Sequence, residues 1–320
     1  MGPSLVEFLT GEYLEGYIKA GGSKIKLVMD DGGEGVTRLL QALCDAAAAR
    51  GYLVGYLHAA AVAKINLFSN LYQAVVRELD LPALVADYCR RVVKACGYEA
   101  GEVPAETDFV AWACERDGRV PEVLRRTVQE RLERDLFRNR FINRSFATVI
   151  LQLAADLLGA REKKLAGADK EILYAWLRGE EVLLRDIRRF HVFTRVDRYN
   201  ARLMLRSLVE LARLGGRAGL FVAVDGLEVL LAKKETSRPL YSKAARDEFY
   251  ESVRQLIDGI DALSFLMIML GFRRELAEDE YKGLRSYEAL WLRIQHEVAG
   301  SRVNFFRDFL DLDAVATAAG

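Results

Sequence analysis

Residues 24–37, KIKLVMDDGGEGVT, join a short apolar run to a glycine-rich turn. The residues that follow, as far as Gly51, carry leucines and alanines at the spacing of an amphipathic helix. A second apolar run, YLVGYLHAAA, begins at Tyr52. The order of strand, glycine-rich turn, helix and strand predicts a βαβ unit whose two strands pair in parallel.

Two further apolar runs lie nearer the other end of the chain. They are GLFVAV at 219–224, which leads into Asp225, and SFLMIML, which begins at Ser264. Continuous apolar runs of this length are typical of parallel strands that are covered on both faces. A helix is expected between them at 241–260, and a last strand is expected at 302–310. The pattern predicts an α/β fold with a parallel sheet.

The long stretch between these two groups of strands is helical in character. Alanine, leucine, arginine and glutamate dominate it, and strand signals are scarce there. We therefore expect a sheet domain that is built from residues 1–65 and 214–320 and is split by a large helical insertion at 66–213.

The composition is that of a folded protein without net charge. Lys and Arg total 46, Asp and Glu also total 46, and 51% of the residues are hydrophobic. These values exclude a disordered chain and a surface that is basic throughout. No apolar run is long enough for a transmembrane helix, and the four cysteines lack C-x-x-C spacing. We expect a cytoplasmic protein with reduced cysteines and no membrane partner.

The glycine-rich turn can be compared with the nucleotide-binding P-loop, G-x-x-x-x-G-K-[ST], which also joins a strand to a helix. In a P-loop, backbone amides hold phosphates, the lysine neutralises them and the hydroxyl holds Mg²⁺. Alignment on Gly35 and Thr37 places Asp30 at the first glycine and Val36 at the lysine.

The turn also carries three carboxylates where a triphosphate would lie, those of Asp30, Asp31 and Glu34. Like charges at ~4 Å repel by up to ~4 kcal/mol at intermediate dielectric. This repulsion and the missing lysine should weaken nucleotide binding by several kcal/mol.

The acidic motif that accompanies a P-loop is four apolar residues followed by Asp-Glu. Its aspartate holds Mg²⁺, and its glutamate activates the attacking water. Here Phe221–Val224 lead into Asp225, but Gly226 stands at the glutamate position. Glu228 lies two residues further on and is expected to point elsewhere unless a bulge redirects it. The sequence therefore keeps the aspartate of this motif and lacks its glutamate.

Three blocks of the sequence together resemble a known family. They are GVTRLLQALCDAAAARGYLVGYL at 35–57, NARLMLRSLVELARLGGRAGLFVAVDGLE at 200–228 and GFRRELAEDEYKGLRSYEALWLRI at 271–294. In order and spacing they are similar to the BREX-system ATP-binding protein family, P-loop ATPases of the AAA+ or origin-recognition type from bacterial anti-phage loci.

The resemblance implies a nucleotide site at the turn. Gly33, Gly35, Val36 and Thr37 would contact the phosphates, and Thr37 and Asp225 would hold Mg²⁺ if nucleotide binds. Because key motif residues are missing, we expect either no cofactor or weakly bound ATP or ADP with Mg²⁺.

The resemblance also implies features outside the turn. The nucleotide-sensor run corresponds here to Gly271–Arg273, which lacks the family's usual sequence. Arg285 and Arg293 match arginines of the family's closing block, so either could act as an arginine finger on a neighbour's nucleotide. After the last expected strand only LDLDAVATAAG remains. The resemblance implies an AAA+-like P-loop parallel sheet. Such proteins normally continue into a helical lid, and this family often into a winged helix. Here we expect a large helical insertion and no C-terminal lid or winged helix.

A basic stretch lies within the expected insertion. Residues 185–206 hold seven arginines against two aspartates, and a smaller arginine group lies at 138–144. Four of the seven recur at three or four residues, so one helix would show them on one face: Arg195, Arg198, Arg202 and Arg206. Such a face could bind the phosphates of DNA, match an acidic partner or remain a solvated surface.

These observations favour one function and leave two alternatives. We expect a degenerate pseudo-ATPase without catalytic residues that regulates or scaffolds an anti-phage defence complex. It would pair with an active P-loop ATPase homologue or another defence-complex subunit, in a homo- or hetero-oligomer. One alternative is a nucleotide-binding ATPase with an unorthodox P-loop, in which Lys24 or Lys26 replaces the missing lysine. The other is a DNA-binding subunit that uses the arginines of 185–206.

Overall fold

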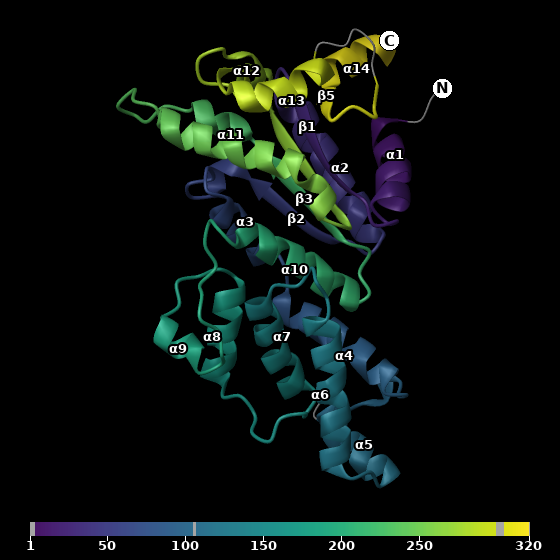
Figure 1. The fold of residues 1–320 in the computed structure, drawn as a ribbon. Coiled ribbons are helices and arrows are strands. Elements are labelled where there is room, and N and C mark those ends of the chain that lie inside the picture. The colour runs from purple at the N-terminus through teal and green to yellow at the C-terminus, as the bar shows by residue number, and fades with distance from the viewer. Residues whose placement is uncertain (1–3, 105–106, 299–303, 320) are drawn as a thin grey trace. The chain divides into compact units, whose positions relative to one another are not determined.

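The computed structural model describes residues 4–104, 107–298 and 304–319. The chain divides into two compact units, one from the described residues of 1–79 and 218–320, the other from those of 80–217. The first unit contains a five-stranded sheet in which every pair of neighbouring strands is parallel (Figure 1). The α/β class and the parallel sheet predicted from the apolar runs are therefore confirmed.

The strands follow the order β2-β3-β4-β1-β5 across the sheet. Their bounds are β1 Ser23–Asp30, β2 Leu53–His58, β3 Leu220–Asp225, β4 Leu266–Arg273 and β5 Phe309–Asp311. The expectation that the first two strands pair directly is wrong, because β3 and β4 lie between them. These two strands are apolar almost throughout and buried along nearly their whole length, which suits the interior of the sheet.

Helices cover both faces of the sheet (Figure 1). Helix α2 (Glu34–Ala49) and the helical segment η1 (Leu9–Tyr17) pack in one core with Val28, Ala223 and Met269. Helices α3 (Phe68–Arg77) and α11 (Lys243–Asp258) meet Val224 and Leu270 on the opposite face. Neighbouring residues thus point to opposite faces, as the pleat of a strand requires.

The remaining helical elements of this unit are between three and eleven residues long. They are α1 Leu5–Phe8, η2 Ala59–Ala61, η4 Leu227–Leu231, η5 Ile260–Ala262, α12 Arg274–Glu278, η6 Leu284–Ser286, α13 Glu288–Val298 and α14 Leu312–Ala319.

The described residues of the second unit form helices and connecting loops. The helices are α4 Leu81–Ala95, η3 Ala100–Glu102, α5 Phe109–Asp117, α6 Pro121–Phe137, α7 Arg144–Leu157, α8 Gly167–Leu177, α9 Leu184–Arg188 and α10 Ala201–Leu214. Buried leucines and valines recur at helical spacing along α4 and α7, so these amphipathic faces supply the unit's core.

The last strand is shorter than expected. It was expected at 302–310, but β5 begins only at Phe309, and residues 302 and 303 lie outside the described part of the chain. The preceding residues turn, and their carbonyls are bound by a side chain of β1. The Nζ of fully buried Lys26 donates hydrogen bonds to the carbonyls of Phe305 (3.1 Å), Phe306 (3.4 Å) and Arg307 (2.5 Å). Lys26 therefore fixes the chain where it enters β5.

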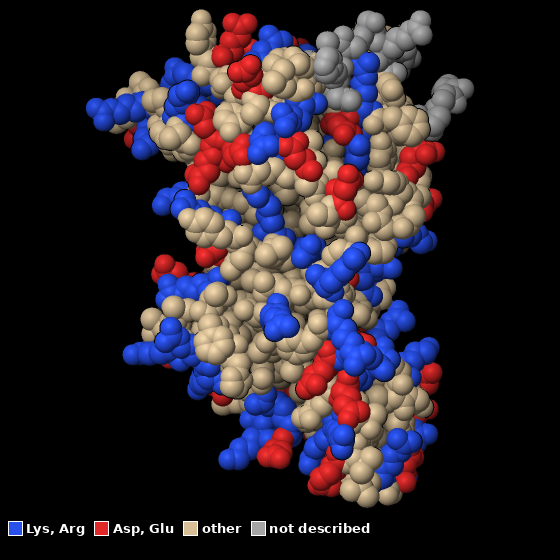
Figure 2. All heavy atoms as spheres, in the orientation of Figure 1, with Lys and Arg blue, Asp and Glu red and all other residues tan. Residues whose placement is uncertain are grey.

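The surface agrees with the balanced composition. Acidic and basic side chains are interspersed over the face seen in Figure 2. In the part of the chain that the structure describes, none of the helices combines the length and the apolar character that crossing a bilayer demands.

We predict that Lys26→Met lowers the free energy of unfolding by about 1–3 kcal/mol, because three partly buried carbonyls would lose the donor that they share. Lys24 is a matched control two residues away on β1, since it forms a partly exposed ion pair with Asp308 at 2.5 Å. Lys24→Met should cost less than about 1 kcal/mol. Urea-induced unfolding of both variants measures the difference, and equal losses would contradict the role given to Lys26.

Candidate functional site

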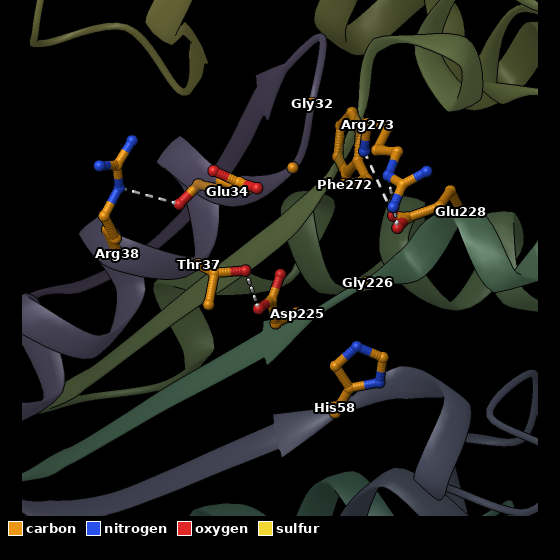
Figure 3. A pocket seen from close by; sticks show the side chains of 11 residues that line it. Gly32, Glu34, Thr37, Arg38, His58, Asp225, Gly226, Glu228, Phe272 and Arg273 are labelled. Atoms are coloured by element: carbon orange, nitrogen blue, oxygen red, sulfur yellow. Dashed lines mark hydrogen bonds and ion pairs between the residues drawn. The ribbon is translucent and has the colours of Figure 1, made fainter.

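All five strands end on a polar residue at the same edge of the sheet. These residues are Asp30, His58, Asp225, Arg273 and Asp311. In open α/β sheets ligands bind in the crevice outside the carboxyl ends of the strands. A hollow of about 410 Å³ lies there, lined by Gly32, Gly33, Glu34, Thr37, Arg38, His58, Asp225, Gly226, Glu228, Phe272 and Arg273 (Figure 3).

The carboxylate of Asp30 is folded back into the glycine-rich turn. Its Oδ1 accepts a hydrogen bond from the amide of Gly33, and its Oδ2 accepts from the amides of Gly35 (2.7 Å) and Val36 (3.1 Å). The residue is only 5% exposed. These amides lie at the N-terminus of α2, the place where a P-loop holds phosphate. An anion that belongs to the chain therefore occupies the amides.

The glycines of the turn make this arrangement possible. Gly33 has a φ of +86°, in the left-handed region that other residues rarely adopt. A Cβ built on Gly35 would lie 2.6 Å from Oδ2 of Asp30. The glycines that suggested a P-loop are thus needed here for the close approach of a carboxylate.

Val36, at the position of the P-loop lysine, points into the core. It is 0% exposed and packs with Leu40 beneath β4, where a Cβ added to Gly271 would lie 2.5 Å from its Cγ1. Lys24 and Lys26, the proposed replacements, are engaged with residues 305–308 instead.

Thr37 and Asp225 are brought together as the motif alignment expected. The hydroxyl of Thr37 donates to Oδ2 of Asp225 at 2.7 Å, and the hydroxyl of Tyr56 donates to the same oxygen at 2.7 Å. Burial, together with the hydrogen bond to Asp225, raises the pKa of Tyr56, so its phenol remains a donor at neutral pH. Tyr56 was not identified from the sequence.

The expectation that Glu228 points away from the site is wrong. Gly226 adopts a φ of +75°, and this left-handed turn returns the chain toward the end of β4. The carboxylate of Glu228 lies 3.4 Å from Nε of Arg273 and accepts from the Arg273 amide at 3.2 Å, as Figure 3 shows. His58 also faces the hollow. The sequence did contain a signal for this site, because each apolar strand ends on a polar residue.

The other two carboxylates of the turn differ in their surroundings. Asp31 pairs with the guanidinium of Arg274, which also binds Asp311 (2.8 Å) and Asp313 (2.9 Å). Hydrogen bonds to Asp311, and further ones to Asp31 and Asp313, raise the pKa of Arg274 and keep it charged. Glu34 is exposed in the first turn of α2, where a negative charge is favourable. The negative charge of the turn is therefore partly compensated within the chain.

The two candidate arginine fingers are absent from the lining of the hollow. Arg285 lies 3.9 Å from Glu280 and stacks over Trp291, and Arg293 binds Asp258 at 3.1 Å.

The four arginines expected on one helix are divided between a loop and a helix. Asp197 accepts hydrogen bonds from the amides of Tyr199 (2.8 Å) and Asn200 (3.1 Å), and α10 begins only at Ala201. The expectation of a single helical face is therefore wrong. The loop carries Arg195 and Arg198, and α10 carries Arg202 and Arg206.

Comparison with known proteins gives one match. The family model described as BREX system ATP-binding protein BrxC/D matches residues 12–315, nearly the whole chain. No curated protein and no solved structure matches.

We predict that Asp30→Asn lowers the free energy of unfolding by about 1–3 kcal/mol, because an amide group would replace an oxygen that accepts from wholly or partly buried backbone amides. Asp31→Asn is the matched control. Its side chain is 72% exposed, and its ion pair is worth at most about 1 kcal/mol. Chemical denaturation compares the two, and an equal or smaller loss for Asp30→Asn would contradict the capping role.

Proposed function

The chain belongs to the BREX system ATP-binding protein family, and on this premise we propose that it is a degenerate AAA+-like pseudo-ATPase. It serves as a regulatory or scaffolding subunit of a phage-defence complex. Family membership makes it a component of such a defence system, in partnership with other subunits.

One observation carries the proposal: the Asp30 carboxylate occupies the amides of the turn. A nucleotide phosphate could bind there only by displacing it. The displaced carboxylate would then lie beside the phosphates, at a cost of about 4 kcal/mol for each pair of like charges at ~4 Å and intermediate dielectric. That cost corresponds to roughly a 1000-fold loss of affinity.

The remaining catalytic groups also fit ATP hydrolysis poorly. Val36 supplies no charge, and Gly226 supplies no base. Glu228 reaches the hollow, but Arg273 neutralises it at 3.4 Å. The residues present therefore do not fit a Mg²⁺-nucleotide, and no reaction step is assigned to the site. The retained pair of Thr37 and Asp225 acts to join α2 to β3.

The alternative is an ATPase with an unorthodox P-loop, and it requires Lys24 or Lys26 to contact the phosphates. Both lysines are engaged elsewhere. Lys26 is buried against three carbonyls, and Lys24 binds Asp308. Among the described residues that line the hollow, Arg38 and Arg273 are the only lysines or arginines, and both have acceptors within the chain: Arg38 donates to the carbonyl of Glu34 at 3.3 Å, and Arg273 pairs with Glu228.

A scaffolding subunit can still contribute to catalysis on its partner. Arg285 has the weaker internal ion pair of the two candidate fingers, at 3.9 Å, and its side chain is partly exposed. It is therefore the better placed to turn toward the nucleotide of an active homologue.

We predict that the protein binds no ATP at millimolar Mg²⁺-ATP in calorimetry. Asp30→Gly should gain affinity on the order of 1000-fold, because it removes the internal anion that competes with phosphate for the amides. The matched control, Asp31→Gly, removes an exposed acidic side chain of the same turn but keeps Asp30, and it should not gain affinity. Circular dichroism checks that both variants fold.

Hydrolysis by the unmodified protein would contradict the proposal. A turnover on the order of 1 s⁻¹ that is lost in Asp225→Ala would show an active site.

We predict a second effect in a complex of this chain with an intact P-loop ATPase homologue. Arg285→Ala should reduce the homologue's ATP turnover by about 1000-fold, the magnitude typical of an arginine finger, while co-elution of the two chains is unchanged. Arg238→Ala, at another exposed position, is the control. Unchanged turnover in a complex that still assembles would exclude the finger role of Arg285.

A further inference from the structure

We propose that the second unit carries a binding surface for single-stranded nucleic acid. Two arginine groups that are far apart in the sequence meet there. The amide of Asn143 donates to Oγ of Ser207 at 2.8 Å, and Nε of Arg206 donates to the carbonyl of Phe141 at 3.1 Å. The loop before α7 therefore lies against α10 and brings both groups to one region, called here the arginine surface: Arg138, Arg140, Arg144, Arg195, Arg198, Arg202 and Arg206.

The charge of this region is almost entirely positive. Residues 138–145 and 193–207 together contain seven arginines and one acidic residue, Asp197. One further carboxylate reaches the region, that of Glu210, which accepts a hydrogen bond from the side chain of Asn139 at 2.8 Å. The carboxylate of Asp197 is used to accept the amides that precede α10. Within the described part of the chain, Arg138, Arg140, Arg144 and Arg195 form no ion pair with a carboxylate. In a protein with no net charge, such a region is a local site for phosphates.

Exposed aromatic rings distinguish this surface from a merely solvated one. Phe193 is 61% exposed and Tyr199 is 78% exposed, and both lie close to arginines in the sequence. The guanidinium of Arg198 lies 4.8 Å from the centre of the Tyr199 ring. Aromatic rings between arginines are the means by which proteins stack unpaired bases while holding the phosphates. The bases of a duplex are already stacked and would leave these rings unused.

The exposed rings are held on a fixed backbone. Nε1 of the buried Trp176 donates to the carbonyl of Thr194 at 2.7 Å, directly between Phe193 and Arg195. The side chain of Asn200 donates to the carbonyl of Arg195 at 2.8 Å and accepts from the amide of Asp197 at 2.9 Å. A preorganised segment loses little entropy on binding, which favours a binding role.

Fluorescence anisotropy of the full chain tests the proposal, with a labelled oligothymidylate strand, an oligouridylate strand and a duplex of equal length as probes. We expect both single strands to bind more tightly than the duplex. Tyr199→Ala should weaken binding of the single strands about 5- to 150-fold, the range typical for removal of one stacking ring. Tyr281→Ala is the matched control, because Tyr281 is 83% exposed in the other unit, and it should change nothing.

A second pair of variants tests the arginines. Arg144→Gln with Arg195→Gln should reduce the slope of log affinity against log salt by about 0.7 for each phosphate that is no longer neutralised. Arg126→Gln with Arg185→Gln is the control, since these exposed arginines pair with Glu130 and Asp186. The slope should then be unchanged.

Four results would overturn the proposal. They are no binding of the single strands at low salt, equal affinity for the duplex, an unchanged affinity in Tyr199→Ala, and equally tight binding of polyglutamate in competition. The last result would assign the surface to an acidic protein partner instead.

Discussion

The hydrogen bonds from the amides of Gly33, Gly35 and Val36 to the Asp30 carboxylate are the constraint on which the site depends. They join the last residue of β1 to the first turn of α2. In a P-loop the corresponding amides bind a phosphate, whereas here they bind a carboxylate of the same chain. The strand-turn-helix geometry can therefore persist without a ligand. This gives a physical reason for the turn to keep its geometry when no nucleotide is bound.

Four of the five strands could be predicted from the sequence because each lies on an apolar run, whereas β5 is much shorter than expected. The limits of β1, β2, β3 and β4 all lie within a few residues of those runs. Their order could not be predicted in the same way. Which strand lies beside β1 depends on contacts between segments more than 200 residues apart, and no local pattern records them.

The sequence predicted several residues of the candidate site but not how their side chains are arranged. The turn, Thr37 and Asp225 followed from motif spacing, and the structure brings the last two together. The capping role of Asp30 did not follow, because it depends on the backbone angle at Gly33. Glu228 was missed for a similar reason, since the left-handed turn at Gly226 redirects the chain. Asp197 likewise delays the start of the helix that was expected to carry the four arginines, because its carboxylate accepts from backbone amides that precede α10.

The central claim is that the amides of the turn are already occupied by Asp30. The most direct measurement is the NMR signals of the Gly33, Gly35 and Val36 amides during titration with Mg²⁺-ATP and with inorganic phosphate. We predict that these signals stay in place at millimolar ligand. Saturable shifts of these amides would show that they are available to phosphate and would contradict it.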